Sequence, residues 1–122
     1  MSKTILVVDD NEMNRKLLRV LLSSRGYSVE EAETGQTGLA QAKSCQPNLI
    51  LLDYRLPDMN GVEIARELKS DDRYASIPII IVTAIALSEE SARITRESGC
   101  LEYITKPIDV HALLDAVEKH IA

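Results

Sequence analysis

Acidic residues follow two of the most apolar segments of this chain. Asp9 and Asp10 come directly after Ile5–Val8, and Asp53 comes directly after Leu49–Leu52. Carboxylates that lie close together repel one another, so such a group either raises the pKa of a member or binds a cation. Mg²⁺ suits these oxygen ligands because it binds one or two carboxylates and keeps positions for phosphate oxygens. No histidine or cysteine directly follows these segments, which disfavours zinc.

A hydroxyl group and an ammonium group follow two further segments. Thr83 comes after Ile79–Val82, and Lys106 comes after Tyr103–Thr105. A metal ion, a lysine and a hydroxyl beside a carboxylate are suited to phosphoryl transfer, because they bind the phosphoryl oxygens while an oxygen nucleophile attacks in line. Asp53 is the predicted nucleophile, since it is the single carboxylate after the central segment and carboxylates can form acyl phosphates.

The segments that carry these residues alternate with helical patterns along the chain. The predicted strands are Ile5–Val8, Val29–Ala32, Leu49–Leu52, Ile79–Val82 and Tyr103–Thr105. This alternation predicts an α/β fold, a doubly wound five-stranded parallel sheet with the flavodoxin-like order 2-1-3-4-5 and five helices. The second and fifth strands mix in polar residues and are predicted edges. Because parallel strands end at one edge of the sheet, the polar residues that follow them are expected to converge there.

The predicted helices have recognisable ends. They run from Glu12 to Arg25 before Gly26, from a Thr34 cap to before Pro47, from an Asn60–Glu63 capping box, from Ser88 to Gly99, and from Asp109 to the C-terminus. In the fourth helix the inward positions Ala92, Thr95 and Ser98 are small or polar, and Ile94 is expected to point outward. Little apolar area then anchors this helix, which is typical of elements that move in switching.

Composition sets the class of protein. The chain has 122 residues, of which 45% are hydrophobic and 27% charged, as in one globular domain over 1–122. A net charge of −5 argues against partners such as nucleic acid or an anionic membrane surface. No signal-peptide layout or membrane-length segment is present, and Cys45 and Cys100 lack a metal or redox spacing. We therefore expect a cytoplasmic protein with two reduced thiols.

Taken together, these motifs resemble the response-regulator receiver domains of two-component signalling, in particular single-domain regulators like those of chemotaxis. The motifs are Asp9-Asp10 after an apolar strand, Leu-Ile-Leu-Leu-Asp-Tyr-Arg-Leu-Pro-Asp-Met-Asn-Gly over 49–61, Ile81-Val82-Thr83-Ala84, and Tyr103-Ile104-Thr105-Lys106-Pro107. Each motif alone is weak evidence, but they occur in the family's order and spacing. The resemblance covers essentially the whole chain.

The resemblance implies a phosphorylation site and a cofactor. Asp53 would accept a phosphoryl group from a phosphohistidine on a histidine kinase or histidine phosphotransfer protein. Mg²⁺ would be bound by Asp10, Asp53 and the backbone carbonyl of Arg55, with Asp9 acting mainly through water. Lys106 would pair with the Asp53 carboxylate or with its phosphoryl group.

The resemblance also implies a conformational switch. Thr83 would move inward to hydrogen-bond a phosphoryl oxygen, and Tyr103 would follow from an outward to an inward rotamer. The Lys106–Pro107 peptide bond would be cis. The surface of the fourth helix, fifth strand and fifth helix would then change and bind a downstream partner.

Other readings stay open. Phosphatases of the haloacid-dehalogenase kind also form an aspartyl phosphate, but Arg55 stands where they have a second Asp. A flavin or nucleotide binder needs a phosphate cradle after the first strand, where the segment 9–12 is acidic. A receiver fold kept only for interaction is disfavoured by the intact set of site residues. We expect self-catalysed phosphorylation and dephosphorylation rather than substrate turnover, and a monomer or weak dimer. A stand-alone protein is favoured over a receiver excised from a hybrid histidine kinase.

Further expectations concern residues that flank the site or lie on two of the helices. Arg55 and Ile85 lie two residues beyond Asp53 and Thr83, where side chains influence how long the phosphoryl group lasts. Met13, Leu17 and Val20 form an apolar row on the first helix beside its core stripe, which indicates a docking face for the phosphodonor. His111 and His120 lie on the last helix and are expected at the surface, remote from the acidic edge.

Overall fold

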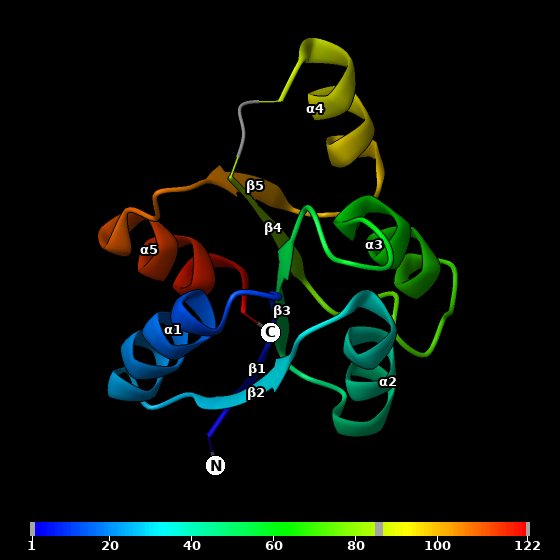
Figure 1. Ribbon diagram of the computed structural model, residues 1–122. Coiled ribbons are helices and arrows are strands. Elements are labelled where there is room, and N and C mark those ends of the chain that lie inside the picture. Colours follow the sequence, from blue (N-terminus) through cyan, green and yellow to red (C-terminus); the bar gives the residue numbers. More distant parts are fainter. Residues whose placement is uncertain (1, 85–86, 122) are drawn as a thin grey trace.

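In the computed structural model, which describes residues 2–84 and 87–121, five parallel strands alternate with five helices (Figure 1). The strands are β1 (Thr4–Val8), β2 (Ser28–Ala32), β3 (Leu49–Asp53), β4 (Ile79–Thr83) and β5 (Glu102–Thr105). The helices are α1 (Glu12–Ser24), α2 (Gly35–Cys45), α3 (Gly61–Lys69), α4 (Glu89–Glu97) and α5 (Val110–His120). The strand order is β2-β1-β3-β4-β5, which confirms the predicted doubly wound sheet and both predicted edges.

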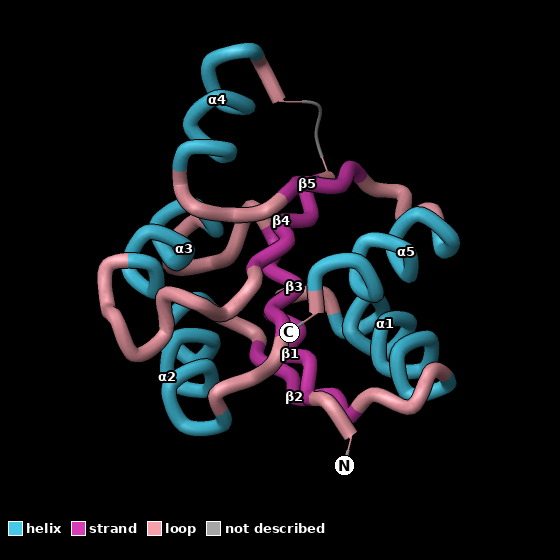
Figure 2. Tube along the Cα trace, turned by 180° about the vertical axis from the view of Figure 1, so that it is seen from behind, coloured by secondary structure: helices cyan, strands magenta, loops and turns pink. Residues whose placement is uncertain are grey.

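The helices cover the sheet on both faces. Figure 2 shows α1 and α5 on one side of the sheet, and α2, α3 and α4 on the other. Successive strand residues point to opposite faces, so Ile5 and Val7 pack with α1 and α5 while Leu6 and Val8 pack with α2 and α3. This two-sided burial explains why β1, β3 and β4 are almost continuously aliphatic.

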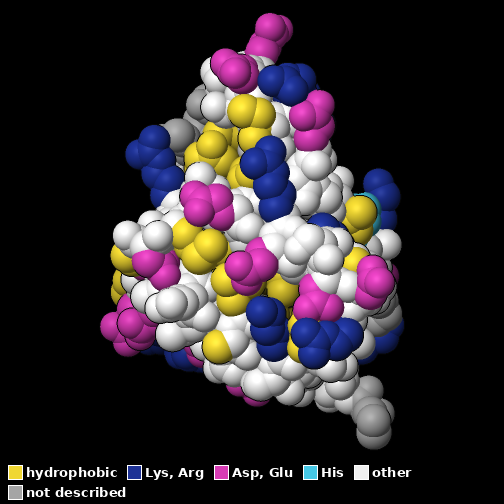
Figure 3. Space-filling view, turned by 90° about the vertical axis from the view of Figure 1, so that its right-hand side faces the viewer, with side chains coloured by type: hydrophobic (Ala, Val, Ile, Leu, Met, Phe, Trp, Pro, Cys, Tyr) yellow, Lys and Arg dark blue, Asp and Glu magenta, His cyan; other side chains and the backbone are white. Residues whose placement is uncertain are grey.

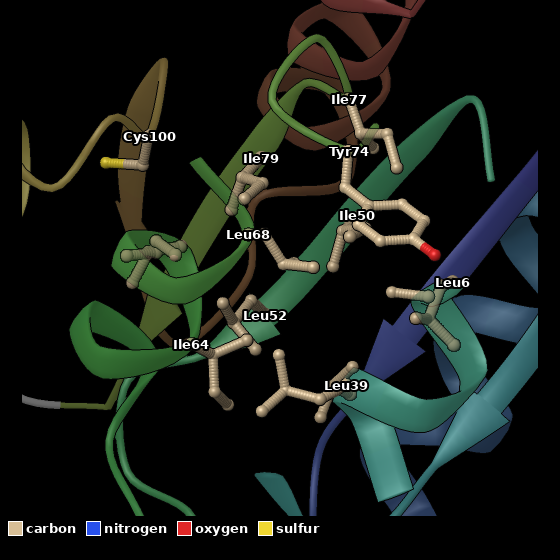
Figure 4. Packing of buried hydrophobic residues seen from close by; sticks show 14 of the residues in the cluster. Leu6, Leu39, Ile50, Leu52, Ile64, Leu68, Tyr74, Ile77, Ile79 and Cys100 are labelled. Carbon is tan, nitrogen blue, oxygen red and sulfur yellow. The ribbon is translucent and has the colours of Figure 1, made fainter. Parts of the chain in front are cut away.

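Among the described residues buried in the core on the α2–α3 side, Tyr74 is the one aromatic side chain. Figure 4 shows Tyr74 from the α3–β4 connection lying among Leu6, Ile50 and Leu68. The chain contains no Phe and no Trp, so branched aliphatic side chains fill most of this volume. The packed core fixes β3 and α3, and with them the position of Asp53 at the end of β3.

The helix ends follow most of the sequence signals. Helix α1 ends at Ser24, one residue earlier than predicted, and Gly26 follows with a φ of +88°. A reciprocal capping box lies at Thr34. The Thr34 side chain accepts from the Thr37 backbone N–H, and the Thr37 side chain accepts from the Thr34 backbone N–H. At Asn60 the structure has only half of the predicted box, because the Asn60 side chain accepts from the Glu63 backbone N–H.

Helix α4 stands at the periphery of the fold (Figure 1). Its fully buried positions, Ala92 and Thr95, are small or polar as predicted, and Ser98 beyond its end is buried as well. The Thr95 hydroxyl donates to the carbonyl of Ser91 at 2.8 Å, so its polar group is satisfied within the helix. The expectation that Ile94 points outward is wrong: its side chain is half-buried and packs against the α2–α3 core.

The surface is charged and mixed in sign. Figure 3 shows the side carrying α2, α3 and α4, where acidic and basic side chains are interspersed. His111 is exposed as predicted, but His120 is mostly buried and its Nε2 lies 2.7 Å from Glu102 Oε2. No sequence pattern predicts this contact, because α5 and β5 meet only in the folded chain. Among the described residues, no helix combines the length and apolarity needed to cross a bilayer.

Candidate functional site

The three carboxylates predicted to bind a cation lie together at one edge of the sheet. In the β1–β3 register Val8 stands beside Leu52, which places Asp9 next to Asp53. One carboxylate oxygen from each of Asp9, Asp10 and Asp53 lies within 4.8 Å of the others. Asp9 and Asp53 are buried, whereas Asp10 is exposed. The parallel topology thus creates the convergence expected from the strand ends.

Lys106 lies between two of these carboxylates. Its Nζ donates to Asp9 Oδ2 at 3.1 Å and to Asp53 Oδ2 at 3.4 Å. Its backbone N–H donates to the carbonyl of Thr83 at 2.7 Å, and the Lys106–Pro107 peptide bond is cis. The pairing of Lys106 with Asp53 was predicted, but the shorter contact with Asp9 was not. Sequence alone does not distinguish which of two adjacent aspartates faces the strand carrying the lysine.

Burial makes the Asp53 carboxylate costly to ionise. Burial and, second, the charge of Asp9 raise the pKa of Asp53 from 3.8 to about 6. The ammonium of Lys106 and the Arg55 backbone N–H, 3.4 Å from Asp53 Oδ1, oppose this shift. A site that holds more negative charge than it can neutralise attracts a cation. The all-oxygen donor set fits Mg²⁺ and gives zinc no preferred ligand.

A cavity of about 310 Å³ opens over the carboxylates. It is lined by Asp10, Asn11, Asn14, Asp53, Arg55, Thr83, Ala84 and Lys106. Thr83 is buried at the end of β4, beside the segment that carries Lys106. The cavity therefore presents a carboxylate, a hydroxyl and an ammonium group to one small ligand. The use of the Arg55 carbonyl as a metal ligand stays a prediction.

Two further expectations concern the switch residue Tyr103 and the residue Ile85. Tyr103 on β5 stands beside Ile81 of β4, and its half-buried side chain packs against the α2–α3 core. Its change of rotamer stays a prediction. Ile85 lies outside the described residues.

Some residues of the site were missed from sequence. Asn11 and Asn14 line the cavity from the start of α1, where Asn11 is the N-cap and accepts from the Asn14 backbone N–H at 3.1 Å. Two asparagines three residues apart, directly after an acidic pair, lie on one face of a helix start, and this spacing was the available signal.

The loop after Asp53 is tied to α2. The Asp58 carboxylate accepts from the backbone N–H groups of Gly35 at 2.7 Å and Gln36 at 2.9 Å. These two bonds lower the pKa of Asp58 and satisfy donors in the first turn of α2. The loop that carries Arg55 is therefore anchored at both ends, by β3 and by Asp58.

Known proteins match this chain over nearly its full length. The family model for the response regulator receiver domain matches residues 5–118. The polar-differentiation response regulator DivK of Brucella anthropi is 39% identical over 121 residues, which cover 99% of this chain and 98% of that protein.

Solved structures agree with the same fold. The chemotaxis protein CheY4 of Vibrio cholerae superposes with a TM-score of 0.91 and 26% identity, covering 99% of this chain and 100% of that one. The signal receiver domain of a signal transduction histidine kinase from Syntrophus aciditrophicus superposes with a TM-score of 0.89 and 27% identity, covering 97% of this chain and 89% of that one.

Proposed function

Because the chain belongs to the response regulator receiver domain family of two-component signalling, we propose that it is a phosphorylation-dependent switch whose phosphoacceptor is Asp53. The observation that carries this proposal is the placement of the Asp53 carboxylate. It lies in a cavity with two further carboxylates within 4.8 Å and a lysine ammonium at 3.4 Å. This arrangement supports attack on an electrophile that arrives with its own negative oxygens.

The proposed step is transfer from a phosphohistidine. One Asp53 oxygen forms a bond to phosphorus while the bond from phosphorus to the imidazole nitrogen breaks, and the electron pair stays on that nitrogen. Lys106, freed from the Asp53 charge once the acyl phosphate forms, binds a phosphoryl oxygen. The Thr83 hydroxyl donates to another. Both groups line the cavity, so the ammonium offsets the new charge and the hydroxyl, once it has moved inward, supplies a hydrogen bond.

The same cavity is the proposed site of Mg²⁺. Asp10, Asp53 and the Arg55 carbonyl would hold the ion directly, and Asp9 would act mainly through water. When bound, Mg²⁺ neutralises charge on the transferring phosphoryl group. The clustering of three carboxylates and the raised pKa of Asp53 support this assignment.

We infer a signalling role rather than turnover of a substrate. Arg55 occupies the place where an aspartyl-phosphate phosphatase carries its acid/base carboxylate, so autodephosphorylation is the expected fate of the phosphoryl group. The free thiols of Cys45 and Cys100 are consistent with a cytoplasmic location. The likeness to the receiver of a histidine kinase keeps a role within a hybrid kinase as the second candidate.

Acetyl phosphate tests the proposed function directly. The protein is incubated with acetyl phosphate with and without Mg²⁺, and intact mass is recorded. One phosphoryl group is expected per chain, and only when Mg²⁺ is present. No added mass at saturating metal would overturn the proposal, and rapid turnover of a phosphomonoester would favour the phosphatase instead.

The donor is proposed to dock on the exposed apolar row of α1. Met13, Leu17 and Val20 are 74%, 44% and 58% exposed, which is unusual for three aliphatic side chains on one helix face. Leu17→Glu is expected to slow transfer from a phosphohistidine protein about tenfold, the effect of losing about 1.4 kcal/mol of binding. Phosphorylation by acetyl phosphate is expected to be unchanged.

A matched control exists just before β5. Leu101 is 51% exposed and directly precedes β5, whereas Lys106 follows the other end of that strand. Leu101→Glu introduces the same charge without touching α1, so transfer is expected at the wild-type rate. Equal slowing by both variants, or slowing with acetyl phosphate as well, would argue against docking on α1.

The output surface is proposed to comprise α4, β5 and α5. Helix α4 buries only Ala92 and Thr95 fully, so its amides are expected to exchange with solvent faster than those of α2. Phosphorylation with acetyl phosphate and Mg²⁺ is expected to change exchange in Glu89–Glu97 while α2 stays constant. Identical exchange of α4 in the two states, measured by mass spectrometry, would contradict this surface.

A further inference from the structure

Arg15 is buried, and it has no role in the proposed phosphoryl transfer. It lies one turn into α1, and its side chain is only 9% exposed. Long charged side chains are seldom buried unless they are paired. Each guanidinium nitrogen has a partner: Nη1 donates to the Asp9 carbonyl at 2.8 Å, and Nε and Nη2 lie 3.3 Å from Glu31 and Glu33.

The hydrogen bond from Arg15 to the Asp9 carbonyl constrains the peptide that leads to Asp10. The Asp9 carbonyl belongs to the peptide that joins Asp9 to Asp10, so its direction sets where the Asp10 side chain begins. The Asp9 backbone N–H is also held, by the carbonyl of Ala32 at 3.1 Å, and its carboxylate binds Lys106. Asp10 is exposed, so the path of the backbone has the larger part in aiming its carboxylate.

The acidic partners explain why Arg15 can hold this carbonyl firmly. An arginine side chain without partners samples many rotamers. The entropy lost when one rotamer is fixed offsets the free energy gained from a single hydrogen bond. Glu31 and Glu33 on and just after β2 fix the guanidinium plane from the side opposite Asp9. The planar guanidinium fork donates from three nitrogens in fixed directions, whereas a lysine offers a single nitrogen.

We propose that Arg15 is a positioning residue for the cation site. It fixes the Asp9–Asp10 peptide against β2 and so holds both carboxylates toward Asp53. Removing it leaves the ligands in place but loosens their orientation. This inference rests on the proposed function, since it assumes that the acidic group binds Mg²⁺. Partners that orient metal ligands typically change affinity 10–100-fold when removed.

Arg15→Met tests the inference, because methionine fills much of the same space without the polar contacts. The protein is titrated with Mg²⁺ alone, and the backbone amides of 9–11 and 53–55 are followed by NMR. The dissociation constant is expected to rise roughly 10-fold or more relative to wild type. Titration well below the unfolding temperature separates affinity from stability.

Arg19→Met is the matched control. Arg19 lies one turn further along α1 and pairs with Glu31 at 2.7 Å, but it does not contact Asp9. This variant loses an ion pair to the same glutamate and is expected to bind Mg²⁺ like wild type. Equal weakening in both variants would assign the effect to Glu31 and overturn the role of the Asp9 carbonyl.

Arg15→Lys keeps the test decisive if Arg15→Met does not fold. The lysine retains the charge but not the fork, so a smaller loss of affinity in the same direction is expected. Wild-type affinity in each folded Arg15 variant would overturn this inference alone. Failure of wild type itself to bind Mg²⁺ would instead overturn the proposed function.

Discussion

The Asp53→Asn variant is expected to gain no phosphoryl group from acetyl phosphate and Mg²⁺, and to be more stable than wild type without metal. The first effect follows because the amide lacks the anionic oxygen that attacks phosphorus. The second follows because the amide removes a buried charge that stands beside Asp9. Intact mass measures the first effect, and thermal unfolding at pH 7 measures the second.

The sign of the stability effect comes from the pKa of Asp53. Because this pKa is raised from 3.8 to about 6, the folded protein keeps a proton in a pH window where the unfolded chain has lost it. The contribution to stability is complete below pH 3.8 and is lost as pH rises through about 6. At pH 7 wild type lacks it, whereas Asp53→Asn is neutral at every pH.

The magnitude follows from the same shift. Each pKa unit is worth about 1.4 kcal/mol, so the upper bound is about 3 kcal/mol. Asp53 lines an open cavity, and solvent screening there reduces the expected gain to roughly 1–2 kcal/mol, a rise of several degrees in unfolding temperature. Saturating Mg²⁺ is expected to stabilise wild type more than Asp53→Asn. The difference in unfolding temperature between the two proteins is then expected to become smaller or to change sign.

Asp72→Asn is the control for charge alone. Asp72 is exposed in the α3–β4 connection, and its replacement changes the net charge by the same amount. It is expected to incorporate phosphoryl at the wild-type rate and to change stability by less than about 0.5 kcal/mol. Phosphorylation of Asp53→Asn at a wild-type level would place the phosphoacceptor elsewhere.

Gly61→Ala is expected to displace Asp53 by pushing on its backbone. A Cβ on Gly61 would lie 2.7 Å from the Asp53 carbonyl oxygen, closer than real Cβ contacts allow. The obstacle is backbone, so either α3 or the end of β3 has to move. Overpacking of this kind costs about 1–3 kcal/mol. A displaced nucleophile is expected to slow phosphorylation by acetyl phosphate roughly tenfold or more.

Gly26→Ala separates loss of stability from loss of geometry. Gly26 has a φ of +88°, so alanine there is strained by about 1 kcal/mol. Among the described residues other than its chain neighbours, none lies within 4 Å of a Cβ built at Gly26, and Gly26 follows α1 at the end far from Asp53. Its phosphorylation rate is expected to match wild type. If Gly61→Ala unfolds more easily yet reacts at the wild-type rate, the contact with the Asp53 carbonyl does not position the nucleophile.

The sequence by itself determined the order of elements, the sheet topology and the residues at the strand ends. Alternation of apolar strands with amphipathic helices leaves few topologies for a chain of 122 residues. Parallel strands end at one edge, so the convergence of Asp53, Thr83 and Lys106 followed from counting strands. These features are local in sequence or follow from topology.

Only the tertiary structure decided how the charged side chains pair. Lys106 lies closer to Asp9 than to Asp53, and Arg15 reaches back to the Asp9 carbonyl. The same holds for Ile94, which packs inward, and for the contact between His120 and Glu102 that joins α5 to β5. The partner of a long side chain depends on its rotamer and on the path of the loops, and residue spacing along the sequence does not encode either. Backbone pairing, by contrast, repeats along a strand and can be predicted from the hydrophobic pattern.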